Sequence, residues 1–153
     1  MGATPKISPF LWFESRAEEA AEFYVALFPD SRVMSVSAVS AGPAKGGAVV
    51  EFELSGQRIT ALDGGPMFKL SPAVSFVVSC DSQEEIDRYW DALSEGGTLG
   101  WCGWLEDRFG LSWQVLPAEL GELMAASPER VMETMFTMQK IDVGLLREAA
   151  QGA

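Results

Sequence analysis

Apolar positions along the chain follow two spacings, and their order predicts the elements. Residues 10–13 form a short apolar run typical of a buried strand, and residues 17–27 repeat apolar side chains every three or four positions, as an amphipathic helix does. The same order returns at a constant offset, with Phe10 falling on Phe76 and Tyr24 on Trp90. The sequence therefore predicts an internal repeat of a strand followed by a helix.

Both helices carry boundary signals. The segments Ser15-Arg16-Ala17-Glu18 and Ser82-Gln83-Glu84-Glu85 have the pattern of capping boxes, in which a hydroxyl and a carboxylate bind free backbone N–H groups. Pro29 is expected to end the first helix, because proline disfavours helical geometry at the preceding residue. Gly96-Gly97 is expected to end the second.

Short strand-like runs follow each helix, so each half is expected to be β-α-β-β-β, with Gly64-Gly65-Pro66 at the junction. A helical tail should follow, with starts at Ser127-Pro128 and at Asp142. Two small motifs cannot each bury both faces of a sheet, so we expect one domain over residues 6–146 with a shared core. The expected strands cover 32–40, 48–54 and 58–63 in the first half, and 98–101, 103–106 and 111–116 in the second.

The composition of the chain limits the classes of partner that we expect it to bind. The net charge of -11 is spread in short acidic clusters, which should repel phosphate backbones and anionic lipid, so nucleic acid and membranes are poor partner candidates. No apolar run is long enough to span a bilayer, and the first residues lack the apolar stretch of a signal peptide. Two cysteines are too few for a disulfide scaffold, so we expect a reduced, cytoplasmic protein.

The combination of these motifs resembles the glyoxalase/bleomycin-resistance (vicinal oxygen chelate) superfamily, and within it the 3-demethylubiquinone-9 3-methyltransferase-like branch. The resemblance covers about residues 6–146. It implies an α+β fold of two paired β-α-β-β-β motifs that form a curled mixed sheet, of the glyoxalase/bleomycin-resistance/dihydroxybiphenyl dioxygenase type, with a C-terminal helical tail. It also implies a homodimer. The repeats would cover about 7–63 and 74–116, and the tail about 117–150. The motifs that carry the resemblance are Pro9-Phe10-Leu11-Trp12-Phe13 followed by residues 17–24, then Gly64-Gly65-Pro66, Cys102-Gly103-Trp104-Leu105 and Gly110-Leu111-Ser112-Trp113-Gln114.

Many members of this superfamily hold a divalent metal with His, Gln or Glu side chains from four strands. The resemblance places the corresponding positions near residues 7–9, at Ala61 or Asp63, at residue 74 or 75, and at Gln114. The chain has no histidine, and Asp63 and Gln114 are the credible oxygen donors among these positions. Two oxygen ligands are too few for a dedicated transition-metal site, so we expect neither a metal nor another cofactor.

Several candidate residues have a functional and a structural interpretation. The curled sheet that the resemblance implies would form a half-open cup. Asp63 is a candidate general base if it faces this cup, or else a turn residue that bonds its own backbone. Gln114 points into either a polar cup or a hydrogen-bonded core network, whereas Trp113 should face a helix. Cys102 and Trp104 lie in the Trp101–Trp104 stretch, which either lines the cup for a flat ligand or packs its rings inside a kinked strand.

Three further features have structural interpretations. The glycine pairs that begin at Gly46, Gly64 and Gly96 are isolated, so they indicate turns and give no support to binding of S-adenosylmethionine. Cys80 is expected to be a small core residue. The tail carries an apolar stripe at helical spacing, which either packs over the sheet or forms a subunit interface. The stripe comprises Val131, Met132, Met135, Phe136 and Met138.

The first functional hypothesis is a protein that binds a small organic ligand without a histidine-bound metal, with Trp12, Asp63, Cys102, Trp104 and Gln114 as the binding residues. An alternative is a lyase, isomerase or dioxygenase that acts on a substrate with vicinal oxygens and uses Asp63 and Gln114. A third possibility is an interaction module whose cup is filled by its own side chains. One fold hosts all three classes, so the fold alone does not choose between them.

Overall fold

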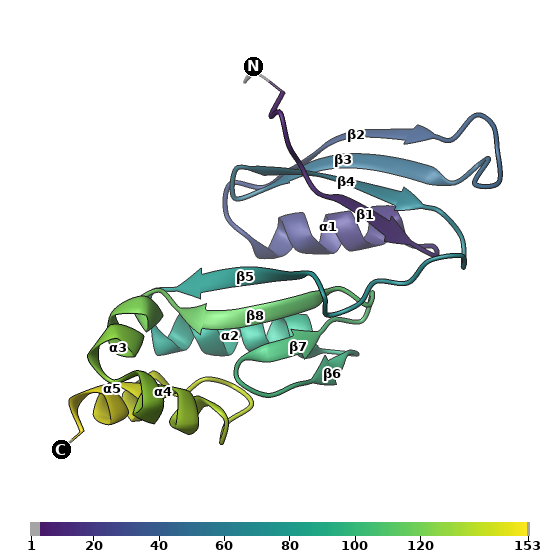
Figure 1. Cartoon of the computed structure of the whole chain (residues 1–153). Helices are drawn as coiled ribbons and strands as arrows, with labels where there is room; N and C mark the ends of the chain where they lie inside the picture. Colours follow the sequence, from purple (N-terminus) through teal and green to yellow (C-terminus); the bar gives the residue numbers. More distant parts are fainter. Residues whose placement is uncertain (1–3, 153) are drawn as a thin grey trace. The chain divides into compact units, whose positions relative to one another are not determined.

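The computed structural model describes residues 4–152, which form two compact units that divide between Leu70 and Ser71 (Figure 1). Each unit has a four-stranded mixed sheet with one helix packed on one of its faces, in the order β-α-β-β-β. The predicted α+β class and the paired motifs are confirmed. The two units are described separately below.

Unit 1 contains sheet A. Its strand order is β1-β4-β3-β2, with β1 parallel to β4 and the other neighbours antiparallel. The elements are β1 (Phe10–Phe13), α1 (Ala17–Leu27), β2 (Arg32–Ala38), β3 (Ala48–Leu54) and β4 (Gln57–Asp63). All three predicted strands of this half are therefore present, within a few residues of their expected ends.

Alternation along the strands places the core of unit 1 between sheet A and α1. Phe52 on β3 and Ile59 on β4 are buried, and Tyr24 on α1 stacks on Phe52 with ring centroids 6.4 Å apart. Alanines on the inner face of α1 let the helix approach the sheet closely. The opposite face of sheet A, which has no helix on it in this unit, is called its open face.

Unit 2 contains sheet B, with strand order β5-β8-β7-β6, and β5 is parallel to β8. Figure 1 shows the three tail helices gathered at the end of sheet B toward which β5 and β8 run. The elements are β5 (Ser75–Cys80), α2 (Gln83–Ser94), β6 (Thr98–Leu99), β7 (Trp104–Glu106), β8 (Ser112–Pro117), α3 (Leu120–Ala126), α4 (Pro128–Met135) and α5 (Val143–Gln151).

The two repeats differ in how the strand joins the helix. Three residues separate β1 from α1, but only two separate β5 from α2. The additional length includes Arg16, which has a φ of 74°. At the constant offset, the buried Leu11 is superposed on Val77, which is 54% exposed. The predicted alignment is therefore correct for the helices but wrong by one position for the strands, and a slip of one residue exchanges the two faces of a strand.

One of the two predicted helix caps is present in the structure, and the other is not. Ser82 caps α2 as predicted, because its hydroxyl accepts a bond from the Glu85 N–H at 3.1 Å. The capping box at Ser15 is wrong: α1 begins after Arg16, which makes no side-chain cap bond. Asp63, from β4, instead accepts the Ala17 N–H at 2.7 Å.

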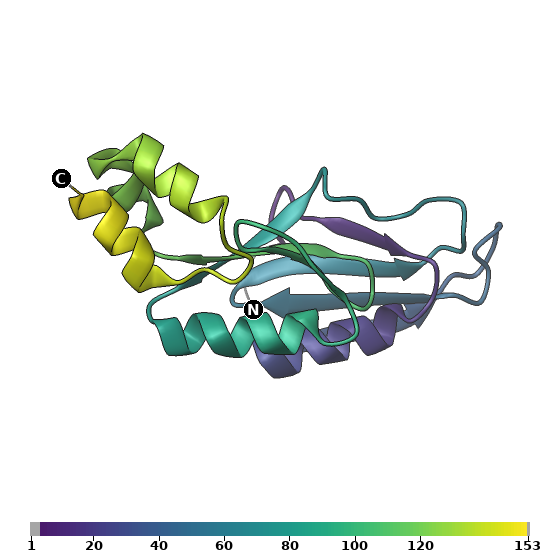
Figure 2. The same cartoon turned by 90° about the horizontal axis from the view of Figure 1, so that it is seen from below.

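The tail forms a second apolar cluster in unit 2. Figure 2 shows the tail helices of this unit grouped together. Val131, Met135 and Met138 from the predicted stripe are buried in it, together with Ile141 and Leu146. The remaining two stripe residues, Met132 and Phe136, are exposed. The stripe therefore divides between core packing and surface. The starts predicted at Pro128 and Asp142 are confirmed.

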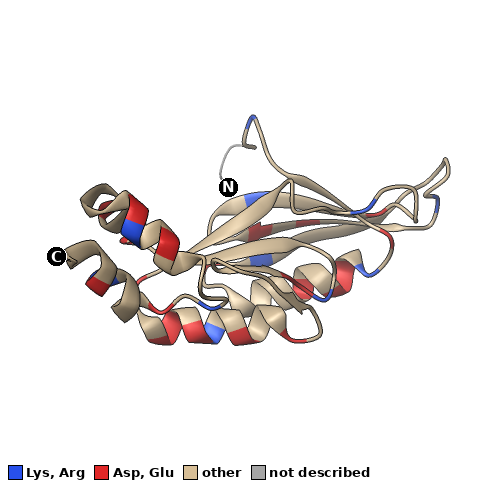
Figure 3. Ribbon diagram, turned by 60° about the horizontal axis from the view of Figure 1, so that its bottom comes forward, with Lys and Arg blue, Asp and Glu red and all other residues tan. Residues whose placement is uncertain are grey.

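Acidic side chains recur along the outer surfaces of α1 and α2 and on the tail helices (Figure 3). Among the described residues, no helix has the length and apolar character needed to cross a membrane.

Candidate ligand-binding faces

The open face of sheet A has an apolar part and a charged part. Trp12, Leu62 and Val49 lie side by side across β1, β4 and β3. Four residues before Leu62 on β4, Arg58 lies opposite Glu53 on β3. Arg32 on β2 forms an ion pair with Glu53 at 3.3 Å. A ligand on this face would therefore meet an aromatic surface at one end and charged groups at the other.

Trp12 is held in a fixed orientation. Its indole N–H donates to the Gly65 carbonyl at 2.9 Å, and its ring meets Phe68 edge-on with centroids 5.0 Å apart. The ring also lies directly against Gly64, where an added Cβ would come 2.2 Å from the Trp12 ring. The glycine at this position thus makes room for the indole, and the partly buried Trp12 is prearranged to present its free ring surface.

Asp63 belongs to the other side of β4. Its Oδ1 accepts the Ala17 N–H at 2.7 Å and its Oδ2 accepts the Ala48 N–H at 3.3 Å. A carboxylate at the first N–H groups of a helix is favoured by the helix dipole as well as by the hydrogen bond. The side chain therefore joins α1 and β3 to β4, and a base role would require it to leave both bonds.

Gln114 lies on the face of sheet B opposite to α2, which is called the open face of sheet B. Its neighbours Trp113 and Val115 are buried toward α2, as predicted for Trp113. Across the sheet, Gln114 is flanked by Val77 on β5 and Trp104 on β7. Its amide nitrogen donates to the Ser75 hydroxyl at 3.0 Å, which also brings together two of the positions named from the resemblance.

The carbonyl oxygen Oε1 of Gln114 accepts no bond from the part of the chain that the structure describes, and no buried side-chain polar atom there lacks a partner. Oε1 is therefore accessible to solvent. The row formed by Val77, Gln114 and Trp104 consequently offers an apolar side chain, an available acceptor and an indole ring on one surface. We call these three residues the sheet B row.

Cys102 and Trp101 lie outside this row. They occupy the turn between β6 and β7, where Cys102 has a φ of 58° and Trp101 is 59% exposed. Cys102 packs against the tail cluster, and burial raises the pKa of its thiol. Trp101 thus does not pack inside, contrary to the structural interpretation of this stretch. Cys80 is buried as predicted, and desolvation raises the pKa of its thiol to about 12.

Sequence reasoning missed Asp107, which is 3% exposed. Its Oδ1 accepts the N–H groups of Phe109 and Leu111 at 2.8 and 3.1 Å, and its Oδ2 accepts the Trp113 indole N–H at 2.9 Å. An aspartate that opens a turn ending in glycine was the available signal. Asp107 holds the turn and the core tryptophan together.

The residues do not fit the metal site of the superfamily. Ala61 and Asp63 face α1 in unit 1, and Ser75 and Gln114 of unit 2 are bonded to each other. No group of three His, Cys, Asp or Glu side chains within residues 4–152 is placed to hold a metal ion. We therefore derive no chemistry through a metal. The three glycine pairs lie in connections between elements, as predicted for turns.

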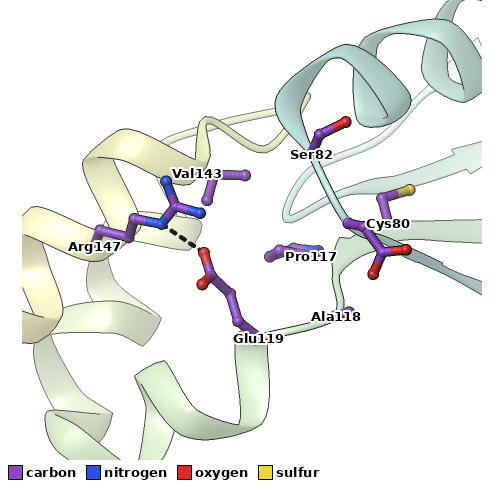
Figure 4. A pocket seen from close by; sticks show the side chains of 8 residues that line it. Cys80, Ser82, Pro117, Ala118, Glu119, Val143 and Arg147 are labelled. Atoms are coloured by element: carbon purple, nitrogen blue, oxygen red, sulfur yellow. Dashed lines mark hydrogen bonds and ion pairs between the residues drawn. The ribbon is translucent and has the colours of Figure 1, made fainter.

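Unit 2 also has a cavity of about 230 Å³ at the carboxyl ends of β5 and β8 (Figure 4). Arg147 lies at its wall and forms an ion pair with Glu119 at 2.6 Å. Cys80, Ser82 and Pro117 also line it. The other charged side chains that line the cavity, Asp81 and Glu119, are acidic, and the Arg147 guanidinium is already paired with Glu119. We therefore take the sheet B row, and not this cavity, as the candidate site.

Comparison with known proteins identifies the family. The family model described as 3-demethylubiquinone-9 3-methyltransferase matches residues 5–116. A PhnB protein from Bacillus cereus is 36% identical over 73% of this chain and 99% of its own, with a TM-score of 0.66. Protein PA1353 from Pseudomonas aeruginosa is 23% identical over 74% of this chain and 98% of its own, with a TM-score of 0.61.

Proteins with much lower sequence identity share this fold. The fosfomycin resistance protein FosX from Mesorhizobium loti is 14% identical over 81% of this chain and 99% of its own, with a TM-score of 0.56, which shows a shared fold alone. No curated protein matches the chain. The resemblance to the family seen in the sequence is confirmed: the chain belongs to the PhnB-like family described as 3-demethylubiquinone-9 3-methyltransferase.

Proposed function

We propose that this protein binds a small organic molecule on the open faces of its sheets, without a histidine-bound metal. The sheet B row carries the proposal, because an indole, an apolar side chain and a solvent-accessible amide oxygen lie side by side there. Binding sites for small molecules are mostly apolar with a few placed polar groups, and this row has that composition. Trp12 supplies a second aromatic surface in unit 1.

The row suggests the chemistry of the ligand. A flat ring can stack on Trp104, and a hydroxyl or amide N–H on that ring can donate to the Gln114 Oε1. The Ser75 bond fixes the amide nitrogen, so the carbonyl oxygen is the end that remains for a ligand. We therefore propose a flat ring compound with at least one hydrogen-bond donor, such as a phenol or an aromatic amide.

The experiment is a thermal-shift screen of phenols, aromatic amides and aromatic acids, with and without a metal chelator. We expect a donor-bearing ring compound to stabilise the protein and the chelator to leave the shift unchanged. Replacing Gln114 or Trp104 with alanine should weaken binding about tenfold, consistent with loss of one hydrogen bond or one ring contact. Trp101→Ala is the matched control, because Trp101 is a tryptophan of the adjacent turn outside the row.

Two results would contradict the proposal. One is a screen in which no organic compound stabilises the protein. The other is a hit that the Trp101 and Trp104 variants weaken equally, since the indole next to Gln114 would then have no particular role. The enzymatic alternative gains no support from Asp63, whose two carboxylate oxygens both bind backbone N–H groups.

We further propose that the protein is a homodimer. The resemblance to the glyoxalase/bleomycin-resistance superfamily, whose members commonly dimerise, supports this proposal, and the exposed Met132 and Phe136 offer apolar surface for an interface. Light scattering after size-exclusion chromatography should give twice the mass of the 153-residue chain. A monomer at micromolar concentration would contradict the proposal.

We also propose a cytoplasmic location. Cys80 and Cys102 are both free thiols, as expected in a reducing compartment. Cell fractionation with an antibody to the native protein tests this, and recovery outside the cytoplasm would contradict it.

A further inference from the structure

We infer that residues 138–143, which run from the connection after α4 into the first residue of α5, hold the Trp101–Trp104 turn in place and so position Trp104 in the proposed site. We call residues 138–143 the strap. The family match ends at residue 116, so the strap is an addition to the matched region. The inference rests on the proposed function only for its effect on ligand binding.

The strap is bonded to the turn through the backbone. The Cys102 N–H donates to the Met138 carbonyl and the Gly103 N–H donates to the Gln139 carbonyl, both at 2.9 Å. The side chain of Cys102 packs against the tail cluster at the same place. Cys102 has a left-handed backbone conformation, which is unfavourable for a residue with a side chain. These contacts compensate for that conformation.

The strap is also bonded to α2 by one side chain. Gln83, the first residue of α2, donates from Nε2 to the Ile141 carbonyl at 2.9 Å and accepts the Val143 N–H on Oε1 at 2.8 Å. Both ends of one amide are therefore used on the strap. Lys140 adds an ion pair with Asp87 at 3.0 Å, but both side chains are about 40% exposed, so water screens the pair.

The turn lies tightly between the strap and β8. The Gly103 carbonyl accepts the Val115 N–H at 2.8 Å, and an added Cβ on Gly103 would lie 2.8 Å from the Val115 carbonyl oxygen and 3.1 Å from Ile141. The next residue is Trp104, the first of β7, which pairs with Gln114. A shift of the turn would therefore move the indole relative to Gln114. Gln83 is a positioning residue in this arrangement, because it acts on the site through the strap.

The first test measures amide hydrogen exchange in the full chain. In Gln83→Ala, the Cys102 and Gly103 amides should exchange about tenfold faster than in the wild type. The substitution removes the two bonds from Gln83 to the strap, and the strap carries the carbonyl groups that accept from these amides. Gln83→Glu should act in the same direction. It keeps an oxygen acceptor for the Val143 N–H and introduces a carboxylate at the start of α2, which the helix dipole favours, but it loses the N–H donor for the Ile141 carbonyl and for Asp87. Gln57→Ala is the matched control, because Gln57 is in unit 1 and its side-chain amide donates to the carbonyl of the adjacent Arg58.

Unchanged exchange at Cys102 and Gly103 in both Gln83 variants would overturn the inference. Faster exchange spread evenly over β5 and β8 would also overturn it, because the effect would then be a general loss of stability. An effect confined to the turn and the strap supports it.

The second test follows Trp104 directly. With 5-fluorotryptophan incorporated, the resonance assigned to Trp104 by its loss in Trp104→Phe should shift in the Gln83 variants and not in Gln57→Ala. Titration with 2-naphthol, a flat ring with one hydroxyl donor, should give about tenfold weaker binding in the Gln83 variants. An unmoved Trp104 resonance, or equal 2-naphthol affinity in all variants, would overturn the positioning role. If 2-naphthol does not bind the wild type, the ligand chemistry proposed above fails, and the resonance alone decides the inference.

Discussion

Replacing Asp63 with alanine should destabilise the protein more than removing the Ser15 hydroxyl just before α1. The substitution removes two acceptors, one for the Ala17 N–H at the beginning of α1 and one for the Ala48 N–H at the beginning of β3. Loss of a helix cap costs about 1 kcal/mol, with a range of roughly 0.5–2. The longer second bond adds about 1 kcal/mol. We expect the free energy of unfolding to fall by about 2 kcal/mol, within a range of roughly 1.5–3.

The assay is urea unfolding followed by far-ultraviolet circular dichroism, with hydrogen exchange at the α1 amides as the local measurement. For a chain of this size, the expected loss corresponds to a fall in Tm of about 5–10 °C if the chain unfolds in one transition. Asp63→Asn should recover part of the stability, because the amide keeps one oxygen acceptor.

Ser15→Ala is the control that refutes or supports the reasoning. Ser15 has the sequence pattern of a cap, but α1 starts two residues later, and the side chain of its cap residue Arg16 makes no cap bond to the helix backbone. Ser15→Ala should therefore change the unfolding free energy by less than about 0.5 kcal/mol. A cost equal to that of Asp63→Ala would show that the local capping box operates in solution and that the bond from β4 does not.

Three further outcomes can be measured by the same urea assay. Burial raises the pKa of Cys80 from 9.0 to about 12; the thiol exposed by unfolding ionises first, so the folded state should lose stability as pH rises from about 9 to about 12, and less so in Cys80→Ala. Asp107→Asn should cost about 2–3 kcal/mol, because the amide NH₂ would replace one carboxylate oxygen and would then face an N–H donor, such as the Trp113 indole, instead of accepting its bond. Trp113→Phe in the same background removes that indole donor and should recover part of the loss. Lys140→Ala should cost at most about 1 kcal/mol, because its ion pair with Asp87 is exposed.

The elements themselves were predictable because their signals are local. Periodicity places a strand and a helix correctly at each predicted position, and Ser82, Pro128 and Asp142 mark helix starts through bonds or backbone preferences within one turn. Alternation also predicted that Trp113 faces α2, because the strand around it is continuous.

The contacts of the polar residues were not predictable in the same way. Asp63 binds a helix that precedes it by 46 positions, and no spacing within a local window reveals such a partner. The strand faces of the two repeats were misaligned for a related reason. One residue more before α1, with Arg16 in a left-handed conformation, leaves the helix pattern in register but exchanges the faces of β1.

These placements also decide which polar group remains for a ligand. Asp63 and Asp107 are both carboxylates near strand ends, and each is fully used by backbone or indole donors within its own unit. Gln114 differs because its nitrogen is bonded to Ser75 while its oxygen is accessible between Val77 and Trp104. A group committed to folding cannot bind a ligand without a loss of stability, whereas an accessible acceptor on a rigid strand can. The search for a ligand should therefore begin at Gln114 rather than at Asp63, the acidic residue at the metal positions that the sequence resemblance implied.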